Sequence, residues 1–240
     1  MLIIKDRTMK RELILKHKYR EILSECDLLK SLDKETSDTF LGLFREETWP
    51  KNTCILNSEK LSLKFYIVLS GRVKMYQVDP FSGKELTLFL LTTCDFFDIF
   101  CLLDSRAHTI YYESLDEVTV LAAPMESLRN WLDENPNEYV NLLPYAGKQL
   151  RLLENSLFEM TFNDISTRLL KLLIKNVNKK SRHLEFIHDL PNKEIAHLLG
   201  STRTVVNRHL QLLKHNGSLK LSRNKMEVQD LNILLQMLDC

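Results

Sequence analysis

The spacing of apolar residues divides the chain into helical ends and a central region with the pattern of β-strands. From residue 10 to about 48, apolar residues recur every three or four positions, which is typical of amphipathic helices. From Trp49 onward the apolar segments become short and rich in β-branched and aromatic residues, and turn signals at 70–71 and 79–83 interrupt them. Several short strands at this spacing predict a β-sandwich or β-roll.

The helical period returns after Pro124 and is clearest between residues 139 and 160. A short helix is expected over 125–134. The 3.5-residue period that follows predicts either a coiled-coil seam between two copies of the chain, and hence a homodimer, or a helix packed on its own sheet. Pro144 should kink this helix or lie in its first turn. The residues of the expected seam are Tyr139, Leu143, Ala146, Leu150, Leu153, Leu157 and Met160.

The segment EIAHLLGSTRTVVNRHL, residues 194–210, has the spacing of a helix-turn-helix. A short helix is expected over 193–199, Gly200 supplies a left-handed turn, and Thr202 can cap the second helix. The later stretch GSLKLSRNKMEVQD predicts a β-hairpin, or wing. The two helices are expected to pack through Ile195, Ala196, Leu199, Val206 and Leu210.

The outward face of the second helix is polar and basic, and the charge of the chain is uneven. Residues 164–240 hold 13 Lys and Arg against 7 Asp and Glu, a net +6, whereas residues 1–163 hold 20 against 25, a net −5. A helix that lies in the major groove needs such a face, so the pattern favours DNA binding over a protein-contact surface. The expected DNA-contacting residues are Ser201, Thr202, Arg203, Thr204, Asn207, Arg208 and Lys214.

Arg208 is the favoured base contact because it lies one turn into the helix, and Lys214 is expected to meet phosphates. The alternative is that Arg203 or Arg208 contacts phosphates alone, in which case that arginine positions the protein but reads no sequence.

The sequence argues against several other classes of protein. No apolar run approaches a membrane span, and the N-terminus is no secretory signal, so a cytoplasmic protein is expected. Five scattered cysteines without C-x-x-C spacing predict neither a disulfide framework nor a zinc site. No Gly-rich phosphate loop, metal-ligand spacing or nucleophile motif is present in the sequence, so we expect no enzyme and no bound metal.

The predicted fold class is α+β, in three parts. Residues 1–134 are expected to form a β-roll with N-terminal helices, residues 135–163 a dimerisation helix, and residues 164–240 a winged helix-turn-helix domain.

This order of elements, with FYIVLSGRVKMY in the roll, resembles the CRP/FNR family of bacterial transcription regulators from about Ile22 to Leu238. The resemblance implies a jelly roll like that of cyclic-nucleotide-binding domains, a homodimer on double-stranded DNA, and contact with RNA polymerase in an activator. In the family pattern R-E-x-x-x-R both arginines match, as Arg203 and Arg208. Thr204 replaces the glutamate, which puts the familiar half-site sequences in doubt.

The part of the roll that binds the nucleotide in this family departs from the family pattern. Asp98-Ile99 stands where the family has Gly-Glu, and His108-Thr109 stands where it has Arg-Ser. Asp95 and Asp98 would repel a phosphate, so no cyclic AMP binding is expected, although Arg106 could approach an anion. Cyclic-nucleotide binders of the family contact adenine through two adjacent hydroxyl residues, and Leu153-Glu154 stands at these positions here. The candidate effector-pocket residues are therefore Asp98, Ile99, Arg106, His108, Thr109, Leu153 and Glu154.

The effector itself stays open at this point. Cys26 alone does not make an iron–sulfur site. The sequence leaves three alternatives. The roll could bind haem through His17, His108 or a cysteine, it could hold a redox pair of Cys94 with Cys101, or it could serve as a fixed scaffold.

Overall fold

The structure is a computed structural model of the chain, and it describes residues 19, 22–26, 29–30, 32–56, 63–97, 99–106, 110–178, 181, 183–223 and 225–238. The chain forms two compact units. Unit 1 comprises residues 1–76 and 89–151, and unit 2 comprises residues 77–88 and 152–240. The boundary therefore falls inside the long helix expected for 135–163, and the tip of one β-hairpin groups with the C-terminal unit. His17 and Asn224 lie outside the described residues.

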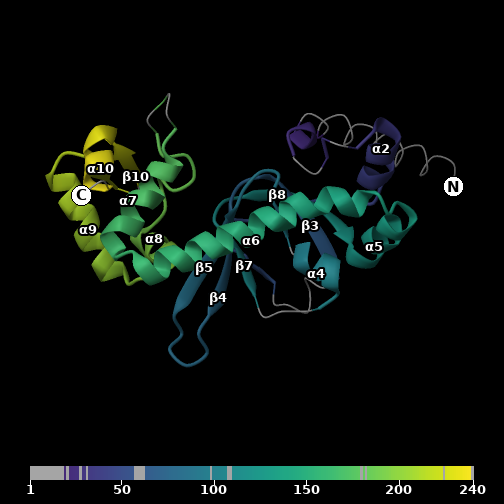
Figure 1. The fold of residues 1–240 in the computed structure, drawn as a ribbon, viewed down its shortest axis with the longest axis horizontal. Coiled ribbons are helices and arrows are strands. Elements are labelled where there is room, and N and C mark those ends of the chain that lie inside the picture. Colours follow the sequence, from purple (N-terminus) through teal and green to yellow (C-terminus); the bar gives the residue numbers. More distant parts are fainter. Residues whose placement is uncertain are drawn as a thin grey trace. The chain divides into compact units, whose positions relative to one another are not determined.

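The β-strands of the front part form two four-stranded sheets, in the orders β1-β8-β3-β6 and β2-β7-β4-β5. Figure 1 labels β3, β4, β5, β7 and β8 of these sheets. This arrangement confirms the expected β-roll. The strands are β1 (Arg45–Trp49), β2 (Cys54–Leu56), β3 (Lys64–Ser70), β4 (Val73–Val78), β5 (Glu85–Leu91), β6 (Phe96–Phe97), β7 (Tyr111–Ser114) and β8 (Val118–Pro124).

Among the described residues, the helices that accompany the sheets are α2 (Lys34–Gly42), α4 (Ile99–Asp104), α5 (Met125–Glu134) and α6 (Glu138–Phe162). The prediction for α5 is confirmed. Helix α6 continues through Pro144, which lies in its second turn. The core of unit 1 forms where β3 and β8 meet the inner face of α6, and it includes Phe65, Ile67, Leu142 and Tyr145.

The expectation that the N-terminal helices run to about residue 48 is wrong. Asp33 caps α2 by accepting a hydrogen bond from the Thr36 amide at 2.8 Å, but the helix ends at Gly42. Residues 45–49 pair instead with β8, from Arg45 opposite Ala122 to Trp49 opposite Val118. The sequence REETW has no apolar alternation because most of this edge strand faces solvent.

Gly71 makes the tight turn between β3 and β4, as the Ser70-Gly71 signal predicts. Its φ is +85°, and a Cβ atom at this position would lie 2.5 Å from the Glu117 carbonyl oxygen. Glycine is therefore required both by the left-handed backbone and by the close approach of the β7–β8 turn.

We expect Gly71→Ala to destabilise the protein by about 3 kcal/mol, because it adds a steric clash to the roughly 1–2 kcal/mol cost of a left-handed residue. Gly83→Ala is the matched control, since Gly83 has φ +66° and nothing within 4 Å of its Cβ position. It should cost only about 1 kcal/mol. Urea unfolding of both variants measures the difference, and equal costs would show that the clash is relieved by backbone movement.

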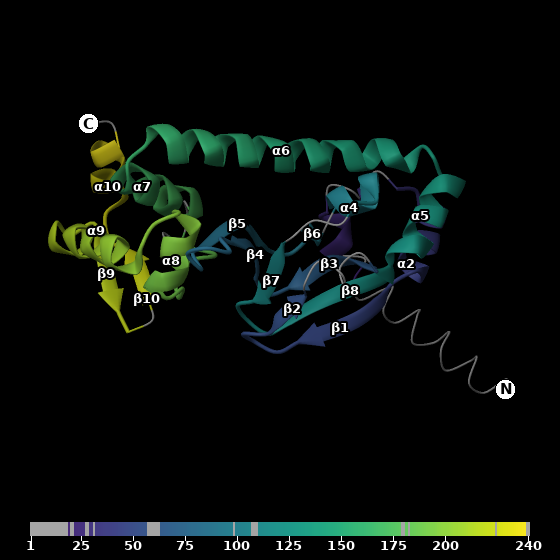
Figure 2. The same cartoon turned by 90° about the horizontal axis from the view of Figure 1, so that it is seen from below.

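The C-terminal part of unit 2 is a winged helix-turn-helix, as expected (Figure 2). Its elements are α7 (Ile165–Asn176), α8 (Asn192–Leu198), α9 (Arg203–His215), β9 (Leu219–Ser222), β10 (Lys225–Val228) and α10 (Leu231–Leu238). Helix α10 packs on α7 and was not predicted as a separate element. Among the helices that the structure describes, none combines the length and apolarity that a bilayer crossing requires.

Candidate DNA-binding surface and effector region

Two helices of unit 2 cross closely because the residues between them are small or fully buried. Ile195 and Val206 are inaccessible to solvent, and Ala196, Leu199 and Leu210 are also buried. Gly200 adopts φ +58°, and the Ser201 amide donates to the Ala196 carbonyl at 2.9 Å, which closes α8. The expected packing half of the helix-turn-helix is confirmed at each of these positions.

The start of α9 is fixed by a side-chain cap. The Thr202 hydroxyl accepts a hydrogen bond from the Val205 amide at 3.4 Å, as predicted for this position. The cap satisfies one amide at the helix N-terminus, and the remaining first-turn amides stay directed outward. Such amides, together with the helix dipole, favour an anion near Arg203.

The outward face of α9 carries the predicted DNA-contacting side chains. Thr202, Arg203, Thr204, Asn207, Arg208 and Lys214 are exposed, and Ser201 is half-buried. Arg203 and Asn207 are four residues apart, so they lie on the same face of the helix. Farther along, Arg208 and Lys214 line a shallow hollow with Gln211, Leu212 and His215.

One contact of this surface was missed by sequence reasoning. The Asn192 amide group donates to Asn207 Oδ1, with a separation of 3.0 Å, and so links the start of α8 to the face of α9. This bond occupies the oxygen of Asn207 and leaves its amide hydrogens to face outward. No sequence pattern predicts a hydrogen bond between asparagines 15 residues apart, so this contact could not be predicted from the sequence.

The basic residues of the wing are unequal. Lys225 pairs with Glu227 at 2.5 Å, and Lys220 lies 4.0 Å from the same carboxylate, whereas Arg223 is exposed at the turn. The hydrogen bond and charge of Lys225 lower the pKa of Glu227. Arg223 is therefore the wing residue whose charge is better placed to meet a phosphate.

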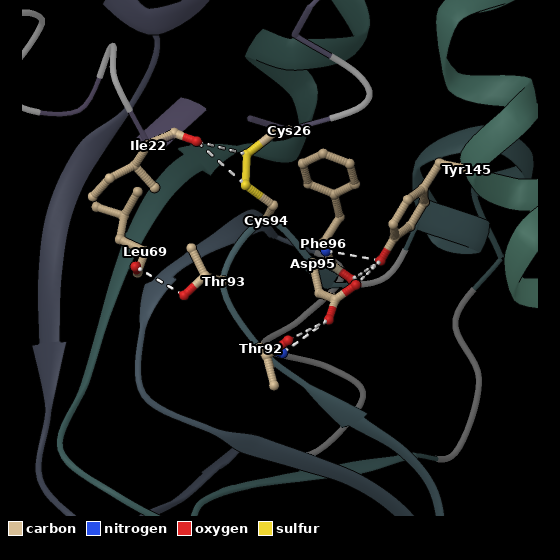
Figure 3. Close-up of a disulfide and its surroundings, with 9 residues drawn as sticks. All are labelled: Ile22, Cys26, Leu69, Thr92, Thr93, Cys94, Asp95, Phe96 and Tyr145. Atoms are coloured by element: carbon tan, nitrogen blue, oxygen red, sulfur yellow. Dashed lines mark hydrogen bonds between the residues drawn. A yellow bond between two sulfur atoms is a disulfide. The ribbon is translucent and has the colours of Figure 1, made fainter. Parts of the chain in front are cut away.

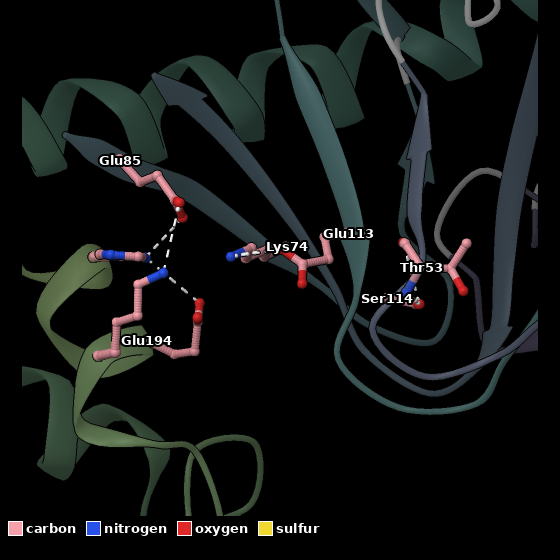
Figure 4. Close-up of polar contacts among 8 residues, drawn as sticks. Thr53, Lys74, Glu85, Glu113, Ser114 and Glu194 are labelled. Carbon is pink, nitrogen blue, oxygen red and sulfur yellow. Dashed lines mark hydrogen bonds and ion pairs between the residues drawn. The ribbon is translucent and has the colours of Figure 1, made fainter. Parts of the chain in front are cut away.

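Residues of the β4–β5 hairpin that group with unit 2 form an ionic cluster with α8, drawn in Figure 4. Glu85 lies 3.1 Å from His197 Nδ1 and 3.7 Å from Lys193 Nζ, and Glu194 lies 3.7 Å from the same histidine nitrogen. The cluster partly neutralises the basic side of α8, so α9 carries most of the positive charge offered by the helix-turn-helix.

The joint between α6 and α7 is short. Helix α6 ends at Phe162, and Asp164 caps α7 by accepting from the Thr167 amide at 2.8 Å. This hydrogen bond holds the pKa of Asp164 below its usual value. One helix therefore ends and the next begins within residues 162–165, beside the expected boundary between residues 163 and 164.

The outward face of α6 matches the predicted seam only in part. Leu143, Leu150 and Leu157 are exposed, as a partner-facing stripe requires. Ala146 is instead buried in the core of unit 1, and Tyr139 packs against that core, so these two residues do not belong to the exposed stripe. Leu153 and Met160 are half-buried. The exposed apolar stripe, as the structure shows it, consists of Val140, Leu143, Leu150, Leu157, Phe158 and Phe162.

The structure describes four of the seven candidate effector residues, so the predicted pocket stays a prediction. Asp98, His108 and Thr109 lie outside the described residues. Ile99 is buried in the core at the start of α4, and Arg106 is exposed beyond the end of that helix, where its amide donates to Asp104. Leu153 and Glu154 belong to unit 2, and Glu154 is exposed.

A different polar cluster lies between the roll and α6 in unit 1. The Phe96 amide donates to the Tyr145 hydroxyl at 2.9 Å, and that hydroxyl lies 3.4 Å from Asp95 Oδ1. Asp95 also accepts from the amide and hydroxyl of Thr92. Burial raises the pKa of the Asp95 carboxyl, and burial together with the Asp95 charge raises the pKa of Tyr145. The sequence marked Asp95 only as a charge that repels phosphate.

Two of the cysteines form a pair that the sequence did not predict. Cys26 and Cys94 form a disulfide, although no disulfide was expected and Cys94 was considered as a partner of Cys101 (Figure 3). Cys101 is buried and is not part of this disulfide. The bonded pair is 68 residues apart, so only the folded chain shows that they meet. Within the described part of the chain, no cluster of His, Cys, Asp and Glu has metal-binding geometry.

A β-roll followed by a long helix and a winged helix-turn-helix, with a basic face on α9, defines a transcription regulator of the winged-helix type. Residues 46–135 match the cyclic nucleotide-binding domain, and residues 166–237 match the Crp-like helix-turn-helix domain. Together these two matches contain both the roll and the surface described above.

Several relatives match this chain over most of its length. A CRP-like cAMP-activated global transcriptional regulator of Mycobacterium tuberculosis is 24% identical over 214 residues, covering 88% of this chain and 95% of the relative. The Cyclic AMP receptor protein of Thermus thermophilus is 26% identical over 211 residues, covering 86% and 94%. A solved CooA variant from Carboxydothermus hydrogenoformans is 26% identical, with a TM-score of 0.69 and coverage of 90% and 97%. The chain belongs to the CRP/FNR family of transcription regulators.

The roles of two α9 side chains can be separated by their effect on specificity. Arg208→Ala should weaken binding to a duplex selected by the wild type by about 1–3 kcal/mol, while binding to random-sequence duplex changes little. Lys214→Ala, the matched control on the same helix, should weaken both duplexes alike and reduce the salt slope by about 1.

Fluorescence anisotropy titrations of both variants on both duplexes provide the four affinities. An equal loss on selected and random DNA for Arg208→Ala would assign this arginine to the phosphates.

Proposed function

We propose that the chain is a sequence-specific DNA-binding transcription regulator that acts as a homodimer and is not controlled by cyclic AMP. The observation that carries the proposal is the face of α9, where Arg203, Asn207 and Arg208 are exposed above a fully buried packing half. A hairpin that served only to pack would have no need of this basic outer face. The proposed site of action is the bacterial cytoplasm, and an activator would also contact RNA polymerase.

The homodimer rests on the apolar stripe of α6. Leu143, Leu150 and Leu157 recur every seven residues and are 58%, 58% and 68% exposed. Apolar side chains in this pattern along one helix are typical of a surface that a second helix covers. Gly147 lies between the first two and would allow the partner helix to approach closely.

The absence of cyclic AMP control rests on residue chemistry. Ile99 occupies the position of the family's glutamate, and it is buried with an apolar side chain that can bind no ribose hydroxyl. Asp95 adds a buried carboxyl on the preceding loop. Two relatives are named for cyclic AMP, one as a cAMP-activated regulator and one as a Cyclic AMP receptor protein. Those names describe the relatives, and we do not extend cyclic AMP binding to this chain.

A redox-responsive regulator is the second candidate, and the Cys26–Cys94 disulfide favours it over a haem sensor. The two histidines considered as haem ligands, His17 and His108, lie outside the described residues.

DNA binding is tested by titrating the purified protein into random-sequence duplex between 50 and 200 mM salt. We expect log affinity to fall linearly with log salt, at a slope of about −0.9 for each phosphate contact. Cyclic AMP added at millimolar concentration should leave the affinity unchanged, and calorimetry should detect no heat of binding. A salt-independent affinity would contradict DNA binding, and a cyclic AMP isotherm would contradict the exclusion of this effector.

The dimer is tested by placing a charge on the stripe. Leu150→Glu and Leu157→Glu should yield monomers in sedimentation velocity and weaken binding to the selected duplex by at least about 100-fold, because one half-site then binds alone. Leu63→Glu is the matched control, since Leu63 is also 68% exposed but directly precedes β3 and is not part of α6. It should remain dimeric. Dimers in all three variants, with unchanged circular dichroism, would contradict the proposed interface.

A further inference from the structure

The Cys26–Cys94 disulfide joins the N-terminal segment to the loop that precedes β6 (Figure 3). The N-terminal segment is anchored by buried residues, among them Tyr19, Leu23 and Leu29. Cys26 is itself inaccessible to solvent, whereas Cys94 is only half-buried. A small thiol or disulfide can therefore reach the bond from the Cys94 side.

Cys94 occupies a backbone conformation that favours glycine. Its φ is +72°, in the left-handed region, which costs a residue with a Cβ atom about 1 kcal/mol or more. The loop is held in this shape by β3, because the Cys94 amide donates to the Val68 carbonyl at 2.9 Å and the Val68 amide donates to the Asp95 carbonyl at 3.0 Å. A cysteine therefore occupies a position where glycine would be less strained.

Both sulfur atoms lie beside one backbone acceptor. The Ile22 carbonyl oxygen is 3.5 Å from Cys26 Sγ and 3.4 Å from Cys94 Sγ. After reduction either thiol can donate a hydrogen bond to this oxygen, so the same site accommodates the dithiol as well as the disulfide.

The loop is in direct contact with the long helix. Cys94 is followed by Asp95 and Phe96, whose carboxylate and amide meet the hydroxyl of Tyr145 on α6. The disulfide is therefore one residue from the first of these contacts, and a change in the Cys94 backbone reaches α6 without any intermediate element.

We propose that Cys26 and Cys94 are a redox-active dithiol–disulfide couple whose state is transmitted to α6 through the Asp95–Phe96–Tyr145 contacts. The reacting partner is a low-molecular-weight thiol and its disulfide. In reduction, the thiolate of the small thiol attacks Cys94 Sγ, and Cys26 leaves as a thiolate. A second small thiolate resolves the mixed disulfide, which releases Cys94 and one molecule of small disulfide. The two protons of the small thiols pass to the two cysteines, and oxidation is the reverse.

The inference deepens the proposed regulator and rests on it only for the effect on DNA. Its test begins without DNA: the full-length protein is equilibrated with defined ratios of reduced and oxidised glutathione, and thiols are counted by alkylation and mass spectrometry. Hydrogen exchange is measured on the same samples. As the ratio of reduced to oxidised glutathione rises, we expect one further pair of thiols to appear. In the reduced protein, the Phe96 amide and the α6 amides around Tyr145 should exchange at least about fivefold faster than in the oxidised protein.

Three variants separate the disulfide from its surroundings. Cys26→Ala should resemble the reduced protein at every glutathione ratio, because Cys94 is free to leave its left-handed conformation. Cys94→Gly should stay protected and insensitive to glutathione, because glycine holds the conformation without the bond. Cys101→Ser, at a buried cysteine outside the disulfide, should respond like the wild type. The reduced wild type supplies the dithiol state even where a variant folds poorly.

A disulfide that cannot be reduced in the folded protein, or full reduction with unchanged exchange at Phe96, would overturn the inference. The DNA arm then measures affinity for the selected duplex in both states, where a change of at least about fivefold is expected. An equal affinity despite altered exchange would overturn the regulatory part. Loss of DNA binding in both states would instead overturn the proposed function and leave the thiol and exchange results to decide the redox couple.

Discussion

The packing of α6 against the roll is the interaction on which the rest of the structure depends. Leu142, Tyr145 and Ala146 bury the inner face of the helix in the core of unit 1. Because a helix has only one face to bury in this way, its rotation is fixed, and the opposite apolar stripe is left outward. The same rotation places Tyr145 against the loop of Asp95 and Phe96. The rotation of α6 about its axis thus determines which apolar residues are exposed. It also determines that Tyr145 contacts the loop of Asp95 and Phe96.

Much of the fold was predictable because local signals and tertiary packing agree. In the helix-turn-helix, the small Ala196, the left-handed Gly200 and the capping Thr202 each have a single structural meaning, and the structure confirms them. The Ser70-Gly71 turn is equally explicit, because no side chain fits there. These are positions where local backbone geometry and packing require the same residue.

The failures occur where the deciding partner is distant in sequence. β1 is a strand because β8 pairs with it, although its own sequence is polar. Ala146 fits a heptad as well as a core, and only the roll decides that it packs inward. The Cys26–Cys94 pair and the Asn192–Asn207 bond leave no periodic trace at all. In the candidate site, the exposed residues of α9 were therefore predictable, whereas the contacts that orient them or regulate the roll were not.

The chemistry of the front unit differs from its architecture in what it offers a ligand. The roll is that of a cyclic nucleotide-binding domain, yet Ile99 is buried in the core, and Asp95 and Phe96 are hydrogen-bonded to Tyr145 of α6. What the region offers in their place is a half-buried sulfur in a strained loop. The same fold can therefore keep the contact between this loop and α6 while the chemistry at the loop differs between family members. In this chain, we propose that the chemistry is a disulfide within the protein.

The proposed homodimer requires two copies of the chain to bind one symmetric DNA site. Selection of binding sites from a random duplex pool, followed by measurement of the mass of the complex on the enriched duplex, tests this requirement directly. We expect an inverted repeat whose half-site centres lie about one helical turn apart, roughly 34–36 Å, with two chains bound to each duplex. An enriched site without two-fold symmetry, occupied by a single chain, would contradict it.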